Sequence, residues 1–477
     1  MERRILRLAN VLVLLLAILA GYLLYWQVFD AAALTGRPDN QRAILEARRV
    51  HRGAILDRNG VALAQTTVDA DGLAHRSLIY KSLAATVGYH SLRVGDSGLE
   101  KTYADVLSGA GPQQTPDDVR RRLLHQPVVG DDLHLTIDAR IQSIAAQALG
   151  GGAGTAIVAD PRSGAILALV SSPGIDPDRI DQPGYWEAIS ASRAGLLLNR
   201  ATQGLYAPGS TFKIITLAAA LQSGAYTLQA PFIGRAATGP LVVEGFLFPY
   251  AINNLPYGVS AVTLQEALQY SDNIVFANVG LKLGGERLLA YANRFGFGQD
   301  VPFDLPVVHS SVTTDPAAFG PLGVASSSFG QGRIQASPMQ MLLATMAIAN
   351  RGTIMKPYLV SSISAPDGQT LRQTQPGPVS WPAPLDAAHA AQVAQAMEAV
   401  VDHGSGFAAR VPGVRVAGKT GTAEVQGQAP HAWFAAFAPA DQPRLAVIVL
   451  KEHGGEGAYV AAPIARRIIQ GALPLVK

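Results

Sequence analysis

The chain of 477 residues is long enough for roughly two to four domains, and its 48% hydrophobic and 15% charged residues favour a packed core and exclude a disordered chain. The formal net charge is only +3, and the one compact basic run, Arg120–Arg122, fits the solvated face of a short helix, so no nucleic-acid partner is expected. The absence of cysteine excludes disulfides and thiolate chemistry, and the ten histidines lack metal-binding spacing, so neither a metal site nor a cofactor is predicted.

An apolar segment opens the chain. Residues 8–29 carry no charge, and a helix of this length at about 1.5 Å per residue spans about 33 Å, enough to cross the hydrocarbon core of a bilayer. Arginines precede the segment, and aromatic residues gather at its far end. Because positive residues stay in the cytoplasm, residues 1–29 are predicted to form a short cytoplasmic tail and a single-pass anchor in the plasma (inner) membrane. The bulk of the chain would then lie outside the cytoplasm.

A cleaved signal peptide is the alternative for this segment. Ala31–Ala33 offers a small-residue cleavage site. The apolar run, however, is longer than the signal-peptide core of about 7–15 residues. Its length therefore favours the anchor.

Residues 30–130 are predicted to form a small N-terminal domain of mixed short elements. Within it, residues 52–66 (RGAILDRNGVALAQT) have the pattern of two short strands around Asn59-Gly60, since Asn-Gly supplies the positive φ angles of a tight hairpin turn. No catalytic constellation occurs in this region, and we interpret it as a spacer or docking module.

Residues 131–477 are predicted to form a second, larger domain. A strand followed by a helix is expected over residues 134–149, strand–turn–strand units over residues 154–173 and 431–453, and an amphipathic helix over residues 462–473. Hairpins at both ends with helices between them indicate an α+β fold, in which one antiparallel sheet packs against a helical region. The helices expected between the hairpins cover residues 210–222, 264–271, 286–295, 338–349 and 387–401.

Ser210 and Lys213 stand at the start of the first of these helices, in YAPGSTFKII. A helix that begins at Ser210 places its hydroxyl in the positive field of the helix N-terminus, and Lys213 lies one turn further on the same face. The helix is apolar nearly all round, so burial would lower the pKa of Lys213 and leave a neutral amine able to take a proton from a serine nucleophile. The structural alternative is that Ser210 merely caps the helix after a Pro-Gly turn.

Two further motifs follow Ser-x-x-Lys along the chain. Ser271-Asp272-Asn273 is the single Ser-x-Asn motif of the sequence, and Lys419-Thr420-Gly421 is the single Lys-Thr-Gly motif. The first two motifs are common by chance, whereas the third is rare. The three together favour an active site over unrelated caps and strand residues.

This ordered set resembles the signature of the penicillin-binding proteins and serine β-lactamases. The hairpin of residues 52–66, with GLEKTY at residues 98–103, is similar to the non-catalytic N-terminal domain of class B penicillin-binding proteins. The resemblance covers nearly the whole chain beyond the membrane segment, and nothing in it resembles a glycosyltransferase domain. It implies a penicillin-binding/serine β-lactamase-like transpeptidase domain on a small N-terminal pedestal, or dimerisation-type, domain. The segments similar to the class B transpeptidase domain are NRATQGLYAPGSTFK, LQYSDNIVFANVG, FGQGRIQASPMQM, GKTGTAE and AWFAAFAP.

The resemblance also implies an acyl-transfer reaction. Ser210 would attack the carbonyl between the two terminal D-alanines of a peptidoglycan stem peptide and form an acyl-enzyme, with Lys213 as general base. Ser271 would relay a proton toward the leaving D-alanine, and Asn273 would hydrogen-bond the substrate backbone and steady Lys213. A second stem-peptide amine would then complete the cross-link, and β-lactams would acylate the same serine as inhibitors.

Substrate binding is implied for the third motif. Lys419 and Thr420 would hold the terminal carboxylate, and Gly421 would leave room for the peptide to lie along a strand. The backbone N–H groups of Ser210 and Thr422 would form the oxyanion hole.

Other functions remain open beside the transpeptidase. The site suits hydrolysis by a D,D-carboxypeptidase or a β-lactamase, and a non-catalytic scaffold or β-lactam sensor is the alternative outside the enzymes. By analogy with the class, a membrane glycosyltransferase of the shape, elongation, division and sporulation group is the expected partner. Outside the motifs, Trp433 is expected in the core or the groove wall, and His431 at the surface where a strand begins.

Overall fold

The computed structural model describes residues 2–26, 47–110, 128–248 and 259–476. The basic run Arg120–Arg122, the cleavage site at Ala31–Ala33 and the boundary expected near residue 30 lie outside the described residues.

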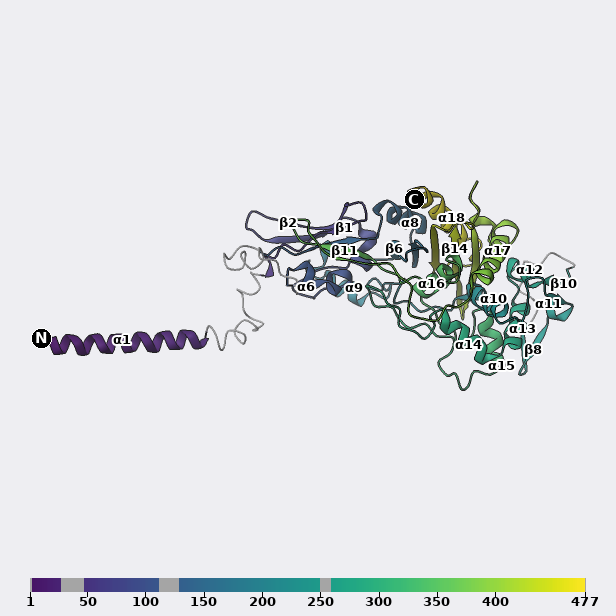
Figure 1. Cartoon of the computed structure of the whole chain (residues 1–477), viewed down its shortest axis with the longest axis horizontal. Coiled ribbons are helices and arrows are strands. Elements are labelled where there is room, and N and C mark those ends of the chain that lie inside the picture. The colour runs from purple at the N-terminus through teal and green to yellow at the C-terminus, as the bar shows by residue number, and fades with distance from the viewer. Residues whose placement is uncertain (1, 27–46, 111–127, 249–258, 477) are drawn as a thin grey trace.

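Helix α1 (Glu2–Leu24) stands apart from the rest of the described chain (Figure 1). Its segment Arg3–Leu24 is the one helix among the described residues that is long and apolar enough to cross a membrane, and none of it is buried against the rest of the described chain. Side chains this apolar are stable without protein contacts only in an apolar medium. The helix therefore has the length and composition of a single-pass membrane anchor.

Six strands drawn from separate parts of the chain form the first sheet, in the order β12-β11-β4-β1-β2-β3. Strand β1 pairs antiparallel with β2 and parallel with β4, and β11 pairs antiparallel with β4. Three of these strands come from beyond residue 130, so the sheet contains residues from both sides of the domain boundary predicted at that residue. The boundary itself stays a prediction from the sequence. The strands are β1 (Ile55–Leu56), β2 (Ala62–Val68), β3 (Ala74–Leu78), β4 (Asp132–Leu135), β11 (Val360–Ser364) and β12 (Thr370–Gln373).

The predicted hairpin is present as β1 and β2, but its turn differs from the expected one. Gly60 has a positive φ of 81°, whereas Asn59 is not among the residues with positive φ. The Asp57 carboxylate accepts the backbone N–H groups of Asn59 and Val61, at 2.7 and 2.9 Å, and so closes the turn. An aspartate before the turn therefore replaces the second left-handed residue that Asn-Gly was expected to supply.

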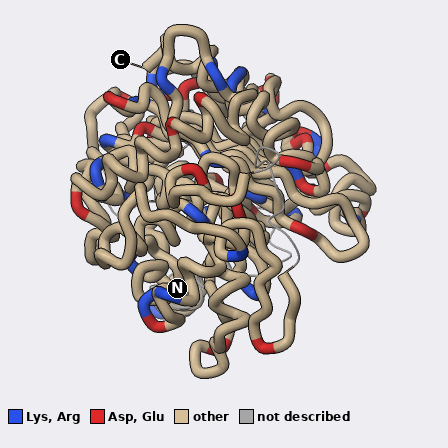
Figure 2. The backbone as a smooth tube through the Cα atoms, turned by 90° about the vertical axis from the view of Figure 1, so that its right-hand side faces the viewer, with Lys and Arg blue, Asp and Glu red and all other residues tan. Residues whose placement is uncertain are grey.

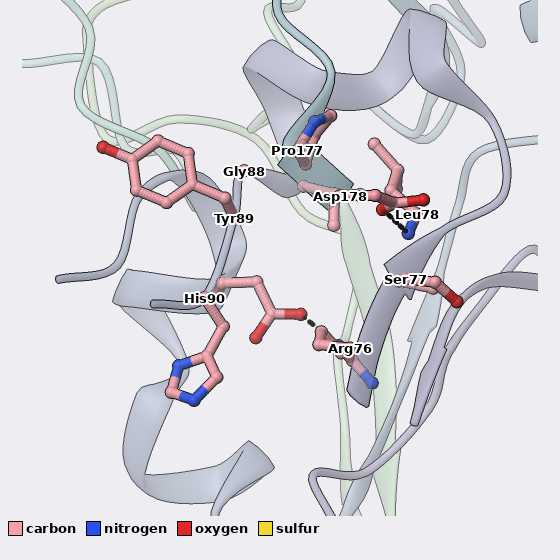
Figure 3. A pocket seen from close by; sticks show the side chains of 11 residues that line it. Arg76, Ser77, Leu78, Gly88, Tyr89, His90, Pro177 and Asp178 are labelled. Carbon is pink, nitrogen blue, oxygen red and sulfur yellow. Dashed lines mark hydrogen bonds and ion pairs between the residues drawn. The ribbon is translucent and has the colours of Figure 1, made fainter. Parts of the chain in front are cut away.

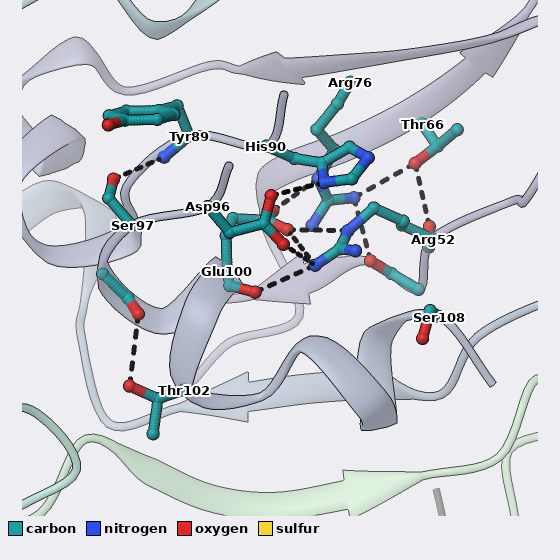
Figure 4. A network of polar contacts seen from close by, with 12 residues as sticks. Arg52, Thr66, Arg76, Tyr89, His90, Asp96, Ser97, Glu100, Thr102 and Ser108 are labelled. Atoms are coloured by element: carbon teal, nitrogen blue, oxygen red, sulfur yellow. Dashed lines mark hydrogen bonds and ion pairs between the residues drawn. The ribbon is translucent and has the colours of Figure 1, made fainter. Parts of the chain in front are cut away.

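A buried ion cluster fixes helix α5 (Gly98–Thr102) on this sheet (Figure 4). The Glu100 side chain is 1% exposed, and its two oxygens accept from Arg52 Nε at 2.8 Å and Arg76 Nε at 2.6 Å. Buried charges are stable only when paired, so the two guanidinium groups and the carboxylate depend on one another. A small pocket beside the cluster is lined by Arg76, Tyr89 and Asp178, among others, and contains none of the motif residues (Figure 3).

The second sheet is antiparallel throughout, with the order β13-β14-β15-β5-β6. This confirms the antiparallel sheet predicted from hairpins at both ends of the larger region. Strand β13 lies at an edge, where it pairs with β14 on one side only. The strands are β13 (Ala417–Val425), β14 (Gln428–Ala438), β15 (Leu445–Lys451), β5 (Gly154–Ala159) and β6 (Ile166–Ser172).

Helices cover both faces of the second sheet. Helices α8 (Ala139–Leu149) and α18 (Ala461–Ala472) pack on one face around one hydrophobic cluster, while α10 (Lys213–Gln222) and α16 (Pro338–Ala349) lie in a second cluster on the other. Helix α17 (Ala387–His403) packs on strand β13. Along the end of the molecule shown in Figure 2, acidic and basic residues are interspersed, in keeping with the small net charge.

The remaining elements surround the second sheet or cover the first. They are η2 (Lys81–Leu83), α4 (Ala84–Val87), α6 (Ala104–Leu107), η3 (Pro177–Arg179), α9 (Tyr185–Ala191), η4 (Gly209–Phe212), β7 (Pro231–Ile233), α11 (Arg235–Thr238), β8 (Leu241–Val243), β9 (Phe246–Phe248), β10 (Ala261–Thr263), α12 (Leu264–Gln269), α13 (Asn273–Leu283), α14 (Gly285–Arg294), α15 (Pro321–Ser328), η5 (Phe407–Ala409) and η6 (Leu473–Leu475).

Candidate active site

Ser210 lies in η4, a 3₁₀ turn that leads directly into α10. Pro208 is the N-cap of this turn, so Ser210 lies inside the turn and is not the helix N-cap that its sequence context suggested. Gly209 (φ 53°) donates its N–H to the carbonyl of Gly330 at 2.9 Å, which fixes the turn from outside the helix. The serine itself is partly exposed.

Lys213 is fully buried one turn further along. Its Nζ donates to Asn273 Oδ1 at 2.6 Å, to the Ser271 carbonyl at 2.7 Å and to Ser271 Oγ at 3.3 Å. Desolvation lowers the pKa of Lys213 to about 7, against the opposing effect of the Asp272 charge. Among the described residues, Lys213 Nζ makes no hydrogen bond to Ser210 Oγ. Its position is fixed instead by its hydrogen bonds to Ser271 and Asn273 of the second motif.

The second motif forms the link between α12 and α13. Ser271 has a left-handed φ of 63°, a conformation that a residue with a side chain rarely adopts and that is a source of local strain. In this conformation both its carbonyl and its hydroxyl accept hydrogen bonds from lysine. Asn273 begins α13, and its amide oxygen faces Lys213.

Asp272 is the middle residue of the second motif, a position for which the motif specifies no side chain. Its Oδ1 accepts the backbone N–H of Val275 at 3.0 Å and so caps α13. Its side chain is buried, and Oδ2 has no hydrogen-bond partner among the described residues. Burial raises the pKa of the carboxyl, against the effect of Lys213. An aspartate before a helix is a generic N-cap signal, so only the fold reveals the charge that it places beside the lysine.

The third motif brings a second buried lysine to the same hydroxyl. Lys419 Nζ donates to Ser271 Oγ at 2.8 Å, to the Thr420 carbonyl at 3.0 Å and to Thr420 Oγ1 at 3.3 Å. Burial and the neighbouring Lys213 charge hold the pKa of Lys419 well below its usual value. Thr420 Oγ1 also shares a hydrogen bond of 2.9 Å with Ser405 Oγ, a contact that no sequence motif indicated.

Gly421 lies where strand β13 meets the turn that carries Ser210. A Cβ on Gly421 would stand 2.9 Å from Thr211 Cγ2 and 3.0 Å from the Pro208 carbonyl. The absence of a side chain at Gly421 therefore allows η4 to pack closely on β13, and the expected role of this glycine in peptide binding stays a prediction. Thr422, the next residue, is partly exposed, and its hydroxyl accepts the Gly457 N–H at 3.3 Å.

Trp433 and His431 lie on strand β14 behind the third motif. Trp433 is fully buried and donates its Nε1–H to the Ala207 carbonyl at 3.1 Å, which confirms its expected place in the core. His431 is partly exposed and lies near the start of β14, in keeping with the expected position. Burial and the neighbouring His453 lower its pKa, and its ring packs against Tyr206 and His453 at centroid distances of 5.4 and 4.6 Å.

The three motifs thus meet at one place, although they come from three different elements. Ser271 Oγ contacts both buried lysines, and η4 packs on β13 beside them. The described residues contain no group of three or more histidine, aspartate or glutamate side chains arranged to hold a metal ion. The arrangement provides a partly exposed hydroxyl, a buried amine of lowered pKa and an edge strand.

Two family models match the chain. The model described as the penicillin binding protein transpeptidase domain matches residues 154–470, and the model of the penicillin binding protein A dimerisation domain matches residues 52–133. The chain is 34% identical over 499 aligned positions to the peptidoglycan D,D-transpeptidase PbpA of Mycolicibacterium smegmatis, with 98% of each chain covered.

Solved structures of penicillin-binding proteins are also similar to this chain. Penicillin-binding protein A from M. tuberculosis, as its ceftriaxone acyl-enzyme complex, has a TM-score of 0.82 at 31% identity and covers 90% of this chain and 100% of that chain. The D,D-transpeptidase domain of a peptidoglycan glycosyltransferase from Eggerthella lenta has a TM-score of 0.79 at 32% identity, with 90% and 99% covered. The chain belongs to the penicillin-binding protein transpeptidase family, and its similarity to these proteins places it with the class B type.

Proposed function

We propose that Ser210 is the nucleophile of a peptidoglycan D,D-transpeptidase and that the residues of the three motifs form its catalytic machinery. The chain is a serine acyltransferase that cross-links stem peptides ending in D-Ala-D-Ala, and β-lactams inhibit it by acylating the same site. One observation carries the assignment of residues: two buried lysines share Ser271 Oγ beside the turn that presents Ser210.

Lys213 is the general base for the attack by Ser210. A neutral amine has two hydrogens, and Asn273 Oδ1 and the Ser271 carbonyl accept them at 2.6 and 2.7 Å. Its lone pair is then free to take the serine proton as the bond from Ser210 Oγ to the substrate carbonyl carbon forms. Ser271 relays this proton toward the nitrogen of the leaving D-alanine when the C–N bond breaks.

Lys419 and Thr420 bind the terminal carboxylate of the donor peptide. Lys419 Nζ lies among Ser271 Oγ, the Thr420 carbonyl and Thr420 Oγ1, and as an ammonium it supplies the positive charge that a carboxylate needs. The backbone N–H groups of Ser210 and Thr422 stabilise the negative oxygen of the tetrahedral intermediate. Strand β13 is an edge strand, so a peptide can pair along it, and Gly421 permits the close approach of η4 that brings these groups together.

The second half-reaction distinguishes this activity from its alternatives. The amine of a second stem peptide attacks the acyl-enzyme, and Ser210 Oγ leaves as the new amide forms. Attack by water instead makes the protein a D,D-carboxypeptidase or, with a β-lactam bound, a β-lactamase. A scaffold or sensor role needs no second step.

The placement of the chain completes the proposal. Residues 1–29 anchor it with the N-terminus in the cytoplasm, residues 30–130 form the pedestal domain, and residues 131–477 form the transpeptidase domain outside the cytoplasm. The arginines before α1 support this orientation. A membrane glycosyltransferase of the shape, elongation and division group is the partner, which analogy with class B proteins supports.

The test is intact-mass measurement of the full-length chain in detergent after incubation with benzylpenicillin, beside a Ser210→Ala variant. We expect one penicilloyl group per parent chain and none on the variant. Rapid hydrolysis of the antibiotic without an adduct would identify a β-lactamase. If the folded protein shows neither an adduct nor hydrolysis of the antibiotic, the scaffold or sensor role would be the function that remains.

A further inference from the structure

An ion pair that the proposed mechanism does not use lies directly after strand β15. Glu452 Oε1 accepts two hydrogen bonds, one from Arg200 Nε and one from the Tyr206 hydroxyl, each at 2.7 Å. Arg200 and Tyr206 are buried, and the Glu452 side chain is 18% exposed. Hydrogen bonds to a charged acceptor are stronger than those between neutral groups, so Glu452 ties both donors firmly to the end of the sheet.

The bond to Arg200 has an ordinary structural role. Arg200 Nη1 and Nη2 donate to the carbonyls of Gly195 and Ala194, both at 2.9 Å. A buried guanidinium needs a counter-charge, and Glu452 is the carboxylate that pairs with it. This pair would hold the loop of residues 194–200 in a protein without any catalytic activity.

The bond to Tyr206 acts on the segment that leads into η4. Tyr206 stands four residues before Ser210, and its backbone N–H and carbonyl exchange hydrogen bonds of 3.1 and 2.8 Å with Ala336. Burial and the Glu452 carboxylate raise the pKa of Tyr206, so its hydroxyl keeps the proton that it donates in the hydrogen bond. Tyr206 is thus fixed both at its backbone and at the far end of its ring.

The position of Ser210 decides its reactivity in the proposed reaction. Its hydroxyl has to lie within reach of Lys213, and its backbone N–H has to face the oxyanion. A misplacement of about 1 Å in such a constellation costs about 100-fold in rate. The groups that bind the donor carboxylate lie on β13 and not on this segment. A shift of Ser210 would therefore slow the chemical step and leave binding nearly unchanged.

We propose that Glu452 is a positioning residue for acylation: through the Tyr206 hydroxyl it holds the turn that carries Ser210 against the end of β15. This inference rests on the proposed function, in which Ser210 is the nucleophile. Glu452 thereby sets the rate of acyl transfer and not the affinity for the donor.

The test is acylation of the full-length chain in detergent by benzylpenicillin, for the parent and for Tyr206→Phe. The dependence of the rate on penicillin concentration separates the rate constant of acylation from the dissociation constant of the noncovalent complex. Phenylalanine keeps the ring that packs against His431 and Trp433, and it leaves the pair of Glu452 and Arg200 intact. We expect the rate constant to fall about 10-fold and the dissociation constant to stay within about 2-fold of the parental value.

Two further variants complete the test. Tyr103→Phe is the matched control, since it removes the hydrogen bond of another partly buried tyrosine to a carboxylate, that of Asp304, beside strand β12 of the first sheet. It should be acylated with the parental rate constant. Glu452→Ala should slow acylation at least as much as Tyr206→Phe, and Tyr206→Phe should have no further effect in that background, where its hydroxyl has lost its partner. If Glu452→Ala does not fold, Tyr206→Phe decides alone, because it leaves the buried ion pair in place.

Three results would overturn the proposal. A parental rate constant in Tyr206→Phe would leave Glu452 as the counter-charge of Arg200 only. A weaker noncovalent complex with an unchanged rate constant would assign the effect to binding. Additive effects of Tyr206→Phe and Glu452→Ala would show that Tyr206 acts without Glu452. A parent that benzylpenicillin does not acylate would refute the proposed function itself, and this inference with it.

Discussion

Lys213 gives acylation a pH dependence of its own. Its pKa is lowered to about 7 by desolvation, so below that pH the nitrogen is an ammonium with no lone pair for the Ser210 proton. We expect the second-order rate constant for benzylpenicillin acylation to rise with pH through about 7. The measurement is stopped-flow or quenched acylation from pH 5 to pH 8, with Lys213→Arg as the control, since a guanidinium stays protonated throughout. A profile that is flat across neutral pH would contradict the assignment of Lys213 as base.

The site residues themselves were open to prediction from sequence, because the three motifs are local patterns. The fold brings the motif residues together, and their roles remain proposals. These residues are Ser210, Lys213, Ser271, Asn273, Lys419 and Thr420. Asp272 and Ser405 were missed, since their importance comes from contacts with residues far along the chain. The helix-cap interpretation of Ser210 failed because the turn η4 begins at Gly209, with Pro208 as its N-cap, so Ser210 lies inside the turn.

The close contact between strand β13 and turn η4 gives a second prediction. In Gly421→Ala the new methyl group would stand 2.9 Å from Thr211 Cγ2 and from Trp433 Cβ, both in well-packed surroundings. The strand must then move away from the turn that carries Ser210, and acylation should slow by about 10- to 100-fold in a folded protein. Rates of penicillin labelling would measure this, with Gly151→Ala as control, since nothing lies within 4 Å of a Cβ there. Labelling of Gly421→Ala at the parental rate would mean that this packing has no bearing on reactivity.

Helices and strands whose ends are marked by local sequence signals have the bounds predicted for them. Elements that depend on contacts with distant parts of the chain do not. Helix α16 has the predicted bounds because Ser337 caps it and proline occupies its first turn. Helix α17 runs two residues beyond its expected end. Helix α13 was not predicted, since only residues 270–272, with the left-handed Ser271 at their centre, separate it from α12. Nothing local indicated that β11 and β12 would join a sheet built mainly by the first third of the chain.

The shared first sheet predicts cooperative unfolding of the two regions. Glu100 is buried between Arg52 and Arg76, so Glu100→Gln leaves Arg76 without a carboxylate in contact and Arg52 with only the 3.7 Å contact to Asp96, and should lower stability by about 3–5 kcal/mol. Because β11 and β12 connect that sheet to α16 and α17, we expect the single transition of the full-length chain to move to lower temperature without splitting. Calorimetry would test this, with the exposed Glu286→Gln as control. Two separate transitions in the variant would show that the regions unfold independently.

The path of the chain through β11 and β12 also has a mechanical consequence. These strands leave α16 and return to α17, and α17 rests on β13, the strand that carries Lys419. The first sheet is thus connected to strand β13 by the covalent chain and by one helix, α17. We therefore expect a displacement of the first sheet to bear on the spacing between β13 and the turn that carries Ser210.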